Sequence, residues 1–286
     1  MPKKNIPSPK IDASPDFSRR NFLKYGAVGM AAPGMVVANK IDVSMPADSE
    51  SASGNKGQFV TDHVDSLVVG GGTAGTIAAI QAGRTGAKTI VMERAGFLGG
   101  TTTRGGVNYP GLFDAWGKQI ITGVGWDLVK ECVEMDGGTL PDFSKVPNRH
   151  WQNQVRVNQY LYYILAEEKC RQAGVQVCYH EFPQRVEKTR DGWQVDCAGF
   201  GTQRRVFCKQ IIDCTGGAEV VGMLGYHRLR GEETMPGTVI FMLGAPADPG
   251  RKVQGRSDLY VHGADSTNSR TVTEANITGR QVVLDR

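Results

Sequence analysis

The sequence has no apolar run long enough to cross a lipid bilayer. A membrane-spanning helix needs roughly 20 consecutive apolar residues, whereas the weakly apolar segment 25–38 has 14 residues and contains three glycines and a proline. There is also no cysteine before Cys132, which excludes lipid attachment to a cysteine near the N-terminus. The sequence therefore predicts no stable membrane anchor.

The same N-terminal region has the pattern of an export signal. Residues 18–24 read SRRNFLK and precede the apolar segment, which ends in VVA. A basic start, a short apolar centre and a small-residue cleavage site are typical of a secretory signal, and the pair Arg19 and Arg20 indicates the twin-arginine type. We expect residues 1–38 to be a twin-arginine signal peptide recognised by that export machinery. The mature protein is then periplasmic or extracellular.

The predicted mature chain has no excess of either charge. Six of the 33 basic residues and two of the 29 acidic residues lie in residues 1–38, so 27 of each remain. A balanced surface gives no indication of nucleic acid or an anionic membrane as a partner. The expected partner is a small-molecule substrate.

A βαβ pattern begins after a linker. Residues 39–62 are polar and small, without periodicity, as expected of a flexible linker. The apolar run 65–69 then predicts a buried parallel strand, and the alanines of residues 74–82 predict a helix that packs closely on the sheet. A second strand, 88–92, ends in Glu93.

The turn between the first strand and the helix is rich in glycine. Gly70, Gly72 and Gly75 have the Gly-x-Gly-x-x-Gly spacing, with Thr73 and Ala74 between the last two. The first glycine allows the tight turn, the second lets the backbone approach a pyrophosphate, and the third permits close contact of helix and strand. The helix N-terminus presents N–H groups to the negative charge. These residues predict a dinucleotide-binding site.

Glu93 bears on the kind of dinucleotide. It stands 18 residues after Gly75, at the end of the second strand. A carboxylate there is expected to accept hydrogen bonds from the ribose hydroxyls of the adenosine and to repel a 2′-phosphate, so NADP is disfavoured.

A second glycine-rich segment, RAGFLGGTTTRGGVN, follows Glu93 where an NAD-binding domain would usually continue into a helix. With this segment, the sequence resembles the FAD-dependent oxidoreductases of the glutathione reductase structural class. More narrowly, it is similar to those related to the flavoprotein part of heterodisulfide reductase. The resemblance covers about residues 64–286. It implies FAD as the cofactor, with Gly99, Gly100 and Thr101 along its pyrophosphate and flavin. An NAD-dependent dehydrogenase is kept as an alternative.

The downstream pattern predicts the rest of an FAD-binding domain. A helix over 157–172 is followed by strands, at 175–179, 185–190, 193–197, 204–209 and 210–215. The resemblance implies that the last strand completes the parallel sheet after an antiparallel meander. It also implies that Thr215 and Gly216 lie near the cofactor, and that Val186 is a candidate for contact with adenine.

The predicted fold class is therefore α/β. A Rossmann-like FAD-binding domain, with a parallel sheet, helices and a three-stranded antiparallel meander, is expected to consist of residues 63–110 and 155–225. Residues 111–154 are expected to form a helical insertion, in which Ile121, Val124, Leu128, Cys132 and Met135 have the spacing of one helix face. Residues 226–286 are expected to begin a substrate domain.

No two cysteines have the spacing of a redox dithiol or a metal site. Disulfide reductases of the resembled class carry a dithiol just after the Leu-Gly-Gly-Thr segment, where this chain has Thr102, Thr103 and Arg104. The family association leaves an iron–sulfur cluster open, but the chain has no ligand motif for one. We expect no metal site, and we expect the six cysteines to be small apolar residues of the interior.

Candidate substrate-binding residues flank or lie within the insertion. Arg104, Asn108 and His150 are of types that orient an anionic or hydroxylated substrate, although a structural role is equally open for each. No catalytic acid or base is assigned, because a flavin itself performs the redox step.

The last residues predict a helix that starts near Thr271 or Thr273 and continues to Arg286. The resembled family ends with a strand and helix that contact the flavin, and we expect this chain to stop before them. The predicted function is an exported FAD-dependent oxidoreductase that acts on a small organic molecule by hydride or electron transfer. The alternative is a truncated fragment that binds FAD without turnover.

Overall fold

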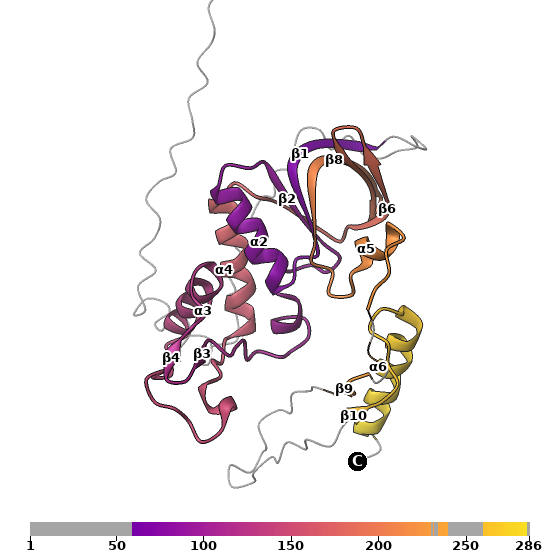
Figure 1. Cartoon of the computed structure of the whole chain (residues 1–286). Helices are drawn as coiled ribbons and strands as arrows, with labels where there is room; N and C mark the ends of the chain where they lie inside the picture. Colours follow the sequence, from indigo (N-terminus) through magenta and orange to yellow (C-terminus); the bar gives the residue numbers. More distant parts are fainter. Residues whose placement is uncertain (1–58, 230, 232–233, 240–259, 285–286) are drawn as a thin grey trace, which may run out of the picture. The chain divides into compact units, whose positions relative to one another are not determined.

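The computed structural model describes residues 59–229, 231, 234–239 and 260–284, except for the side chain of His150. The predicted signal peptide and most of the predicted linker lie outside these residues. Within them, a six-stranded sheet has the strand order β5-β2-β1-β8-β7-β6 (Figure 1). The sheet joins a parallel half to an antiparallel half.

The parallel half is the predicted Rossmann-like unit. β1 (Val60–Val69) lies between β2 (Thr89–Glu93) and β8 (Thr202–Asp213) and is parallel to both. β5 (Gln176–Tyr179) extends the sheet beside β2, again in parallel. Helix α2 (Thr73–Arg84) connects β1 to β2. The carboxyl ends of β1, β2 and β8 therefore meet at one edge, where ligands of such sheets bind.

The antiparallel half is the predicted meander. β6 (Phe182–Thr189) pairs with β7 (Gly192–Gly199), and β7 pairs with β8. β8 is a single strand of 12 residues, so the expectation of two strands at 204–209 and 210–215 was wrong. It pairs with β7 over residues 202–208 and with β1 over residues 204–213, and so connects the two halves.

β1 also begins earlier than the sequence suggested. Residues 60–62 were assigned to the linker, but they pair with residues 204–206 of β8. Asp62 forms an ion pair with Arg204 of that strand, which fixes this end of β1 to the sheet.

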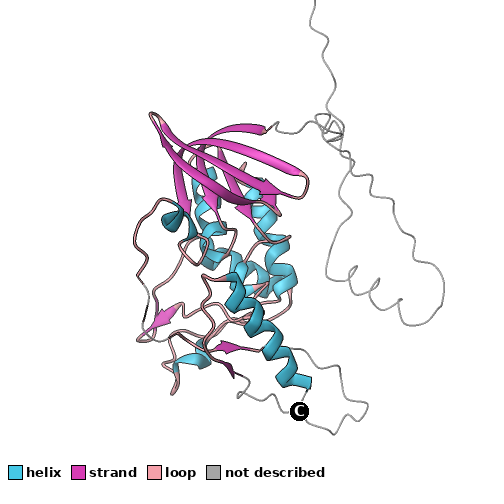
Figure 2. Ribbon diagram, turned by 90° about the vertical axis from the view of Figure 1, so that its right-hand side faces the viewer, coloured by secondary structure: helices cyan, strands magenta, loops and turns pink. Residues whose placement is uncertain are grey.

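Two hydrophobic clusters lie on opposite faces of the sheet, because alternate residues of a strand point to opposite sides. Val68 belongs to the cluster shared with the helices, whereas Leu67 and Val69 belong to the cluster under the curved meander. All three are buried. Figure 2 shows the meander strands curving away from the helices.

Helices α3 (Val124–Met135) and α4 (Gln159–Gln172) complete the helical face. The central part of the predicted α3 stripe is buried, but Ile121 and Met135 at its ends are exposed. Residues 111–123 precede α3 and include the short strands β3 (Asp114–Ala115) and β4 (Lys118–Gln119), and η3 (His150–Asn153) ends the insertion.

The remaining elements are short, apart from the last helix. They are η2 (Gly100–Thr102), α5 (Glu219–Met223), β9 (Gly237–Thr238), β10 (Tyr260–Val261) and α6 (Ser269–Leu284). The predicted C-terminal helix corresponds to α6 and begins two residues before Thr271. Among the helices of the described residues, none has the length and apolar character to span a membrane.

Candidate functional site: a dinucleotide pocket

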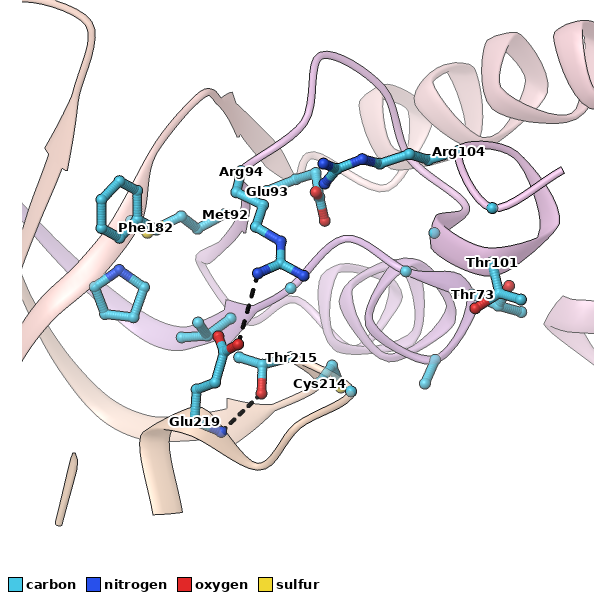
Figure 3. Close-up of a pocket in the computed structure, with 18 of the residues that line it drawn as sticks. Thr73, Met92, Glu93, Arg94, Thr101, Arg104, Phe182, Cys214, Thr215 and Glu219 are labelled. Carbon is cyan, nitrogen blue, oxygen red and sulfur yellow. Dashed lines mark hydrogen bonds and ion pairs between the residues drawn. The ribbon is translucent and has the colours of Figure 1, made fainter. Parts of the chain in front are cut away.

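A pocket of about 640 Å³ opens at the carboxyl ends of β1, β2 and β8 (Figure 3). Its volume is within the usual range of small-molecule sites. Most of the predicted cofactor residues line it: Gly70, Gly72, Thr73, Ala74, Glu93, Gly100, Thr101, Thr215 and Gly216. Three predicted residues, Gly75, Gly99 and Val186, are not among its lining residues.

Gly70 and Gly75 are required by the packing of the protein itself. A Cβ on Gly70 would lie 2.4 Å from the Cys214 carbonyl oxygen, and its φ of +99° disfavours any other residue. A Cβ on Gly75 would lie 1.8 Å from the Gly70 carbonyl oxygen. These two glycines let β1, α2 and the end of β8 approach one another.

Gly72 is different, because nothing in the described part of the chain requires a glycine there. Its φ of −61° and ψ of −179° are available to any residue. The nearest atom to a Cβ on Gly72 would be the Gly100 Cα at 3.9 Å, an ordinary contact distance. The side chain would occupy the pocket instead, so the glycine keeps open the space that a ligand would fill.

The N-terminus of α2 faces this space without a cap. Gly72 is the N-cap residue and offers no side chain, and the first turn has no acidic residue. The hydroxyl of Thr73 does not cap the helix either, because it donates to the Gly99 carbonyl oxygen at 3.1 Å. An uncapped helix N-terminus carries partial positive charge and free N–H groups, which suits an anionic ligand such as a pyrophosphate.

The second glycine-rich segment packs directly on the first. The Gly99 N–H donates to the Gly71 carbonyl oxygen at 2.8 Å, and a Cβ on Gly100 would lie 2.8 Å from the Gly72 Cα. Gly99 thus supports the pocket through its hydrogen bond to Gly71 without lining it, whereas Gly100 is a lining residue. The two segments together shape one site.

Glu93 connects the glycine turn to the end of β2. Its Oε2 accepts from the Gly71 N–H and its Oε1 from the Ala95 N–H, both at 2.7 Å. The side chain is buried. This structural role is additional to the predicted contact with a ribose, and the sequence did not indicate it.

The turn after β8 is organised by Asp213. Its Oδ1 accepts from the Thr215 hydroxyl at 2.7 Å, and its Oδ2 accepts from the Val221 N–H at 3.1 Å. The Thr215 hydroxyl in turn accepts from the Glu219 N–H at 2.9 Å. The predicted cofactor neighbour Thr215 therefore uses its hydroxyl to hold the turn. The Asp-Cys-Thr-Gly-Gly sequence is rich in turn-forming residues, a signal that could have identified Asp213.

The end of the pocket beyond Glu93 is lined by Glu181, Phe182 and Pro183. Val186 instead belongs to the core beneath the meander, where its side chain is 8% exposed. The difference arises because β6 begins at Phe182, three residues earlier than expected, so the start of that strand reaches the pocket and Val186 lies further along it.

Among the described residues, the charges around the pocket leave one cation without an ion-pair partner. Three carboxylates line it, and each is already engaged: Glu93 by backbone N–H groups, Glu181 by Arg204 at 2.7 Å, and Glu219 by Arg94 at 3.6 Å. Figure 3 shows the last of these pairs. Arg104 also lines the pocket, is exposed, and forms no ion pair with any described residue.

The other two candidate substrate residues are placed differently. Asn108 lies outside the pocket, and its side-chain amide donates to the Val157 carbonyl oxygen at 3.0 Å. His150 is the first residue of η3, and its side chain lies outside the described part of the structure. The structure therefore brings only Arg104 of the three to the pocket.

The cysteines are all free thiols. Five are buried and Cys214 is half-buried beside the pocket. Burial raises the pKa of Cys132 to about 11 and that of Cys170 to about 12, which keeps both thiols protonated near neutral pH. In the described residues there is no group of three or more His, Cys, Asp or Glu side chains that could hold a metal ion.

Comparison with known proteins identifies the family. The chain belongs to the family of FAD-dependent oxidoreductases, whose pattern matches residues 65–280. This assignment favours FAD over the NAD alternative.

Individual relatives match only part of the chain. Over 96 residues it is 38% identical to pseudooxynicotine dehydrogenase of a Pseudomonas species, covering 32% of this chain and 19% of that protein. Over 102 residues it is 39% identical to the acrylate reductase flavoprotein subunit of Shewanella woodyi, covering 34% and 17%. The match thus spans less than a fifth of the length of these curated relatives.

The chain also resembles solved structures, among them the anhydrotetracycline hydroxylase OxyS of Streptomyces rimosus. The two are 20% identical, the match covers 61% of this chain and 35% of that one, and the TM-score is 0.44. Another is THI4 of Thermovibrio ammonificans, with 16% identity, coverage of 57% and 61%, and a TM-score of 0.40.

Proposed function

We propose that the pocket at the ends of β1, β2 and β8 binds FAD and that the protein is an exported oxidoreductase of small organic molecules. The observation that carries the proposal is the open space beside Gly72, a glycine that neither the backbone conformation nor the packing of the chain requires. Membership of the FAD-dependent oxidoreductase family supports the choice of FAD.

Different residues of the pocket would contact different parts of FAD. The N–H groups at the start of α2, with Gly72, Thr73 and Ala74, would hold the pyrophosphate, and the guanidinium of Arg104 would add a full positive charge. The adenosine would lie between Glu93 on one side and Phe182 on the other. Thr101 and Gly216 would border the part of the cofactor that extends away from the sheet.

Bound FAD supplies the redox chemistry by accepting or donating a hydride or electrons. The chain contributes orientation and charge, and we assign no general acid or base. A small organic substrate is consistent with relatives named for pseudooxynicotine and acrylate.

Absorption spectroscopy tests the cofactor directly. The protein purified after removal of residues 1–38 should show the visible bands of oxidised flavin and should release one equivalent of FAD on denaturation. A colourless protein that also fails to bind added FAD in a titration would contradict the assignment. Reduction of the bound flavin by a candidate substrate would separate an enzyme from a passive FAD-binding fragment.

The proposed export follows from the pattern of residues 18–38. A fusion of residues 1–38 to a folded reporter should be exported, and the double substitution R19K/R20K should retain the reporter in the cytoplasm. Export of the doubly substituted fusion at the same rate would exclude the twin-arginine route.

A further inference from the structure

A second pocket, of about 870 Å³, lies beside the first and shares Arg104 with it. It is formed by the turn after η2, the end of α3 with the loop that follows, and the segment that leads into α4. We call it the arginine pocket, and its lining includes Arg104, Asn108, Val133, Val155, Arg156 and Val157.

The walls of the arginine pocket are fixed by specific hydrogen bonds. Asn108 makes two bonds to Val157: its carbonyl oxygen accepts from the Val157 N–H, and its side-chain amide donates to the Val157 carbonyl oxygen, each at 3.0 Å. Asn158 caps α4 and donates from Nδ2 to Asp136 at 2.9 Å, which connects the start of α4 to the end of α3. None of these bonds uses an arginine, so the cavity is formed without its cations.

The lining of the arginine pocket is largely polar, with two exposed arginines. Val133, Val155 and Val157 also belong to the lining but are at least 97% buried, so they fix its base and expose little surface. Arg104 and Arg156 are exposed and form no ion pair with any described residue. The single carboxylate among the lining residues, Asp136, is engaged by Asn158.

We infer that the arginine pocket binds a small organic acid, which it presents to the cofactor pocket. The guanidinium of Arg156 has no ion-pair partner among the described residues, and such a group binds a carboxylate strongly. Arg104, which would face the FAD pyrophosphate in the loaded protein, lines both pockets, so the two pockets adjoin at this residue and Arg156 is the cation left for the substrate carboxylate. This inference rests on the proposed function, because it gives the substrate class of the same enzyme.

The experiment compares benzoate with benzamide, which have similar shapes and differ in charge, on the flavin-loaded protein. Calorimetric titration should show saturable binding of benzoate and much weaker binding of benzamide. R156Q should weaken benzoate binding by about tenfold or more, as expected for loss of a hydrogen bond to a charged group. R84Q is the matched control, because Arg84 is exposed in α2 and lines neither pocket. It should leave benzoate affinity unchanged.

FAD affinity, measured in parallel, separates this inference from the proposed function. R156Q should leave FAD affinity unchanged, because Arg156 does not line the cofactor pocket. Benzoate should also perturb the visible spectrum of the bound flavin. If the protein binds no FAD but R156Q still loses benzoate binding, the proposed function is wrong. The arginine pocket then remains an anion-binding site.

Four results would overturn the inference while leaving the FAD assignment intact. The first is equal binding of benzamide and benzoate, and the second is unchanged benzoate affinity in R156Q. The third is the absence of saturable binding of benzoate, hexanoate and acetate. The fourth is benzoate binding without any change in the flavin spectrum, which would make the pocket an anion site unconnected with the substrate.

Discussion

The Glu93 carboxylate accepts a hydrogen bond from the backbone N–H of Gly71 at 2.7 Å, and so connects the end of β2 to the glycine turn after β1. Its other oxygen accepts from the Ala95 N–H. A residue expected to bind a ribose therefore also holds the shape of the pyrophosphate site. The two roles are separable by experiment.

Glu93→Gln tests the structural role. The substituted amide must place its NH₂ group against the N–H of either Gly71 or Ala95, which leaves one buried donor unsatisfied at a cost of about 1–3 kcal/mol. We expect urea unfolding of the FAD-free protein to show a loss of stability of that size, together with weaker FAD binding. Weaker FAD binding with unchanged stability would instead mean that Glu93 acts only by binding the ribose.

Gly72→Ala tests the ligand space. The backbone at Gly72 accepts alanine without strain, and the added Cβ contacts the protein only at an ordinary distance. The stability of the FAD-free protein should stay within about 1 kcal/mol of the original value. FAD affinity should fall by about fivefold or more, because extra volume in a filled site costs about 1–3 kcal/mol.

Gly70→Ala is the matched control for that prediction. Its Cβ would meet the Cys214 carbonyl at 2.4 Å, so this variant should lose stability even without FAD. Gly72→Ser adds a second check, since serine is a better N-cap than glycine and should slightly stabilise the helix while it weakens FAD binding. Full FAD affinity in both Gly72 variants would contradict the assigned site.

The sequence predicted the parallel strands and the glycine turn because their patterns are local. Each strand is a short apolar run, and each glycine has a fixed spacing from it. The division of β8 failed for the opposite reason. Lys209 and Gln210 are polar and exposed, so they resemble the end of a strand, and the pairing of β8 with β7 does end at residue 208. The pairing of β8 with β1 continues to residue 213 and keeps the chain extended through them.

Which face of α4 is buried also depends on the neighbouring helices. Helical spacing places Ile164 on one face with Leu161 and Leu165, but Ile164 is 52% exposed, whereas Tyr162 is fully buried against the rest of the helical cluster. Helical spacing gives the existence of a face, but the neighbouring helices determine which face is covered. Similarly, no sequence pattern indicated that Phe182 and Pro183 would reach the pocket, because this follows from where β6 begins.

Arg204 gives a prediction about stability. It pairs with Glu181 through two nitrogens and with Asp62, and its side chain is 13% exposed. Burial acts to lower the pKa of Arg204, but the paired carboxylates raise it above its usual value, so the guanidinium stays charged. Arg204→Met should cost about 3–5 kcal/mol because it leaves Glu181 buried without a counter-ion.

The matched control for Arg204 is Arg185→Met. Arg185 pairs with Glu187 on the surface of β6, where both side chains are more than 40% exposed. Exposed pairs contribute about 0–1 kcal/mol. Chemical unfolding should therefore show a larger loss of unfolding free energy in Arg204→Met than in Arg185→Met. Equal losses would show that the ion pairs of Arg204 stabilise the protein no more than an exposed pair does.

Cys214 reports on occupancy of the pocket. It is the only cysteine that lines the pocket and the only one of the six that is not fully buried. Burial raises the pKa of its thiol, so reaction with a disulfide reagent at pH 8 should be slower than that of a free thiol.

In the reduced, FAD-free protein we expect one thiol to react, and six after denaturation. FAD should suppress the native reaction and Cys214→Ser should abolish it, whereas Cys132→Ser should leave it unchanged because Cys132 is buried between α3 and α4. Reaction of a different cysteine, or no protection by FAD, would place the cofactor elsewhere.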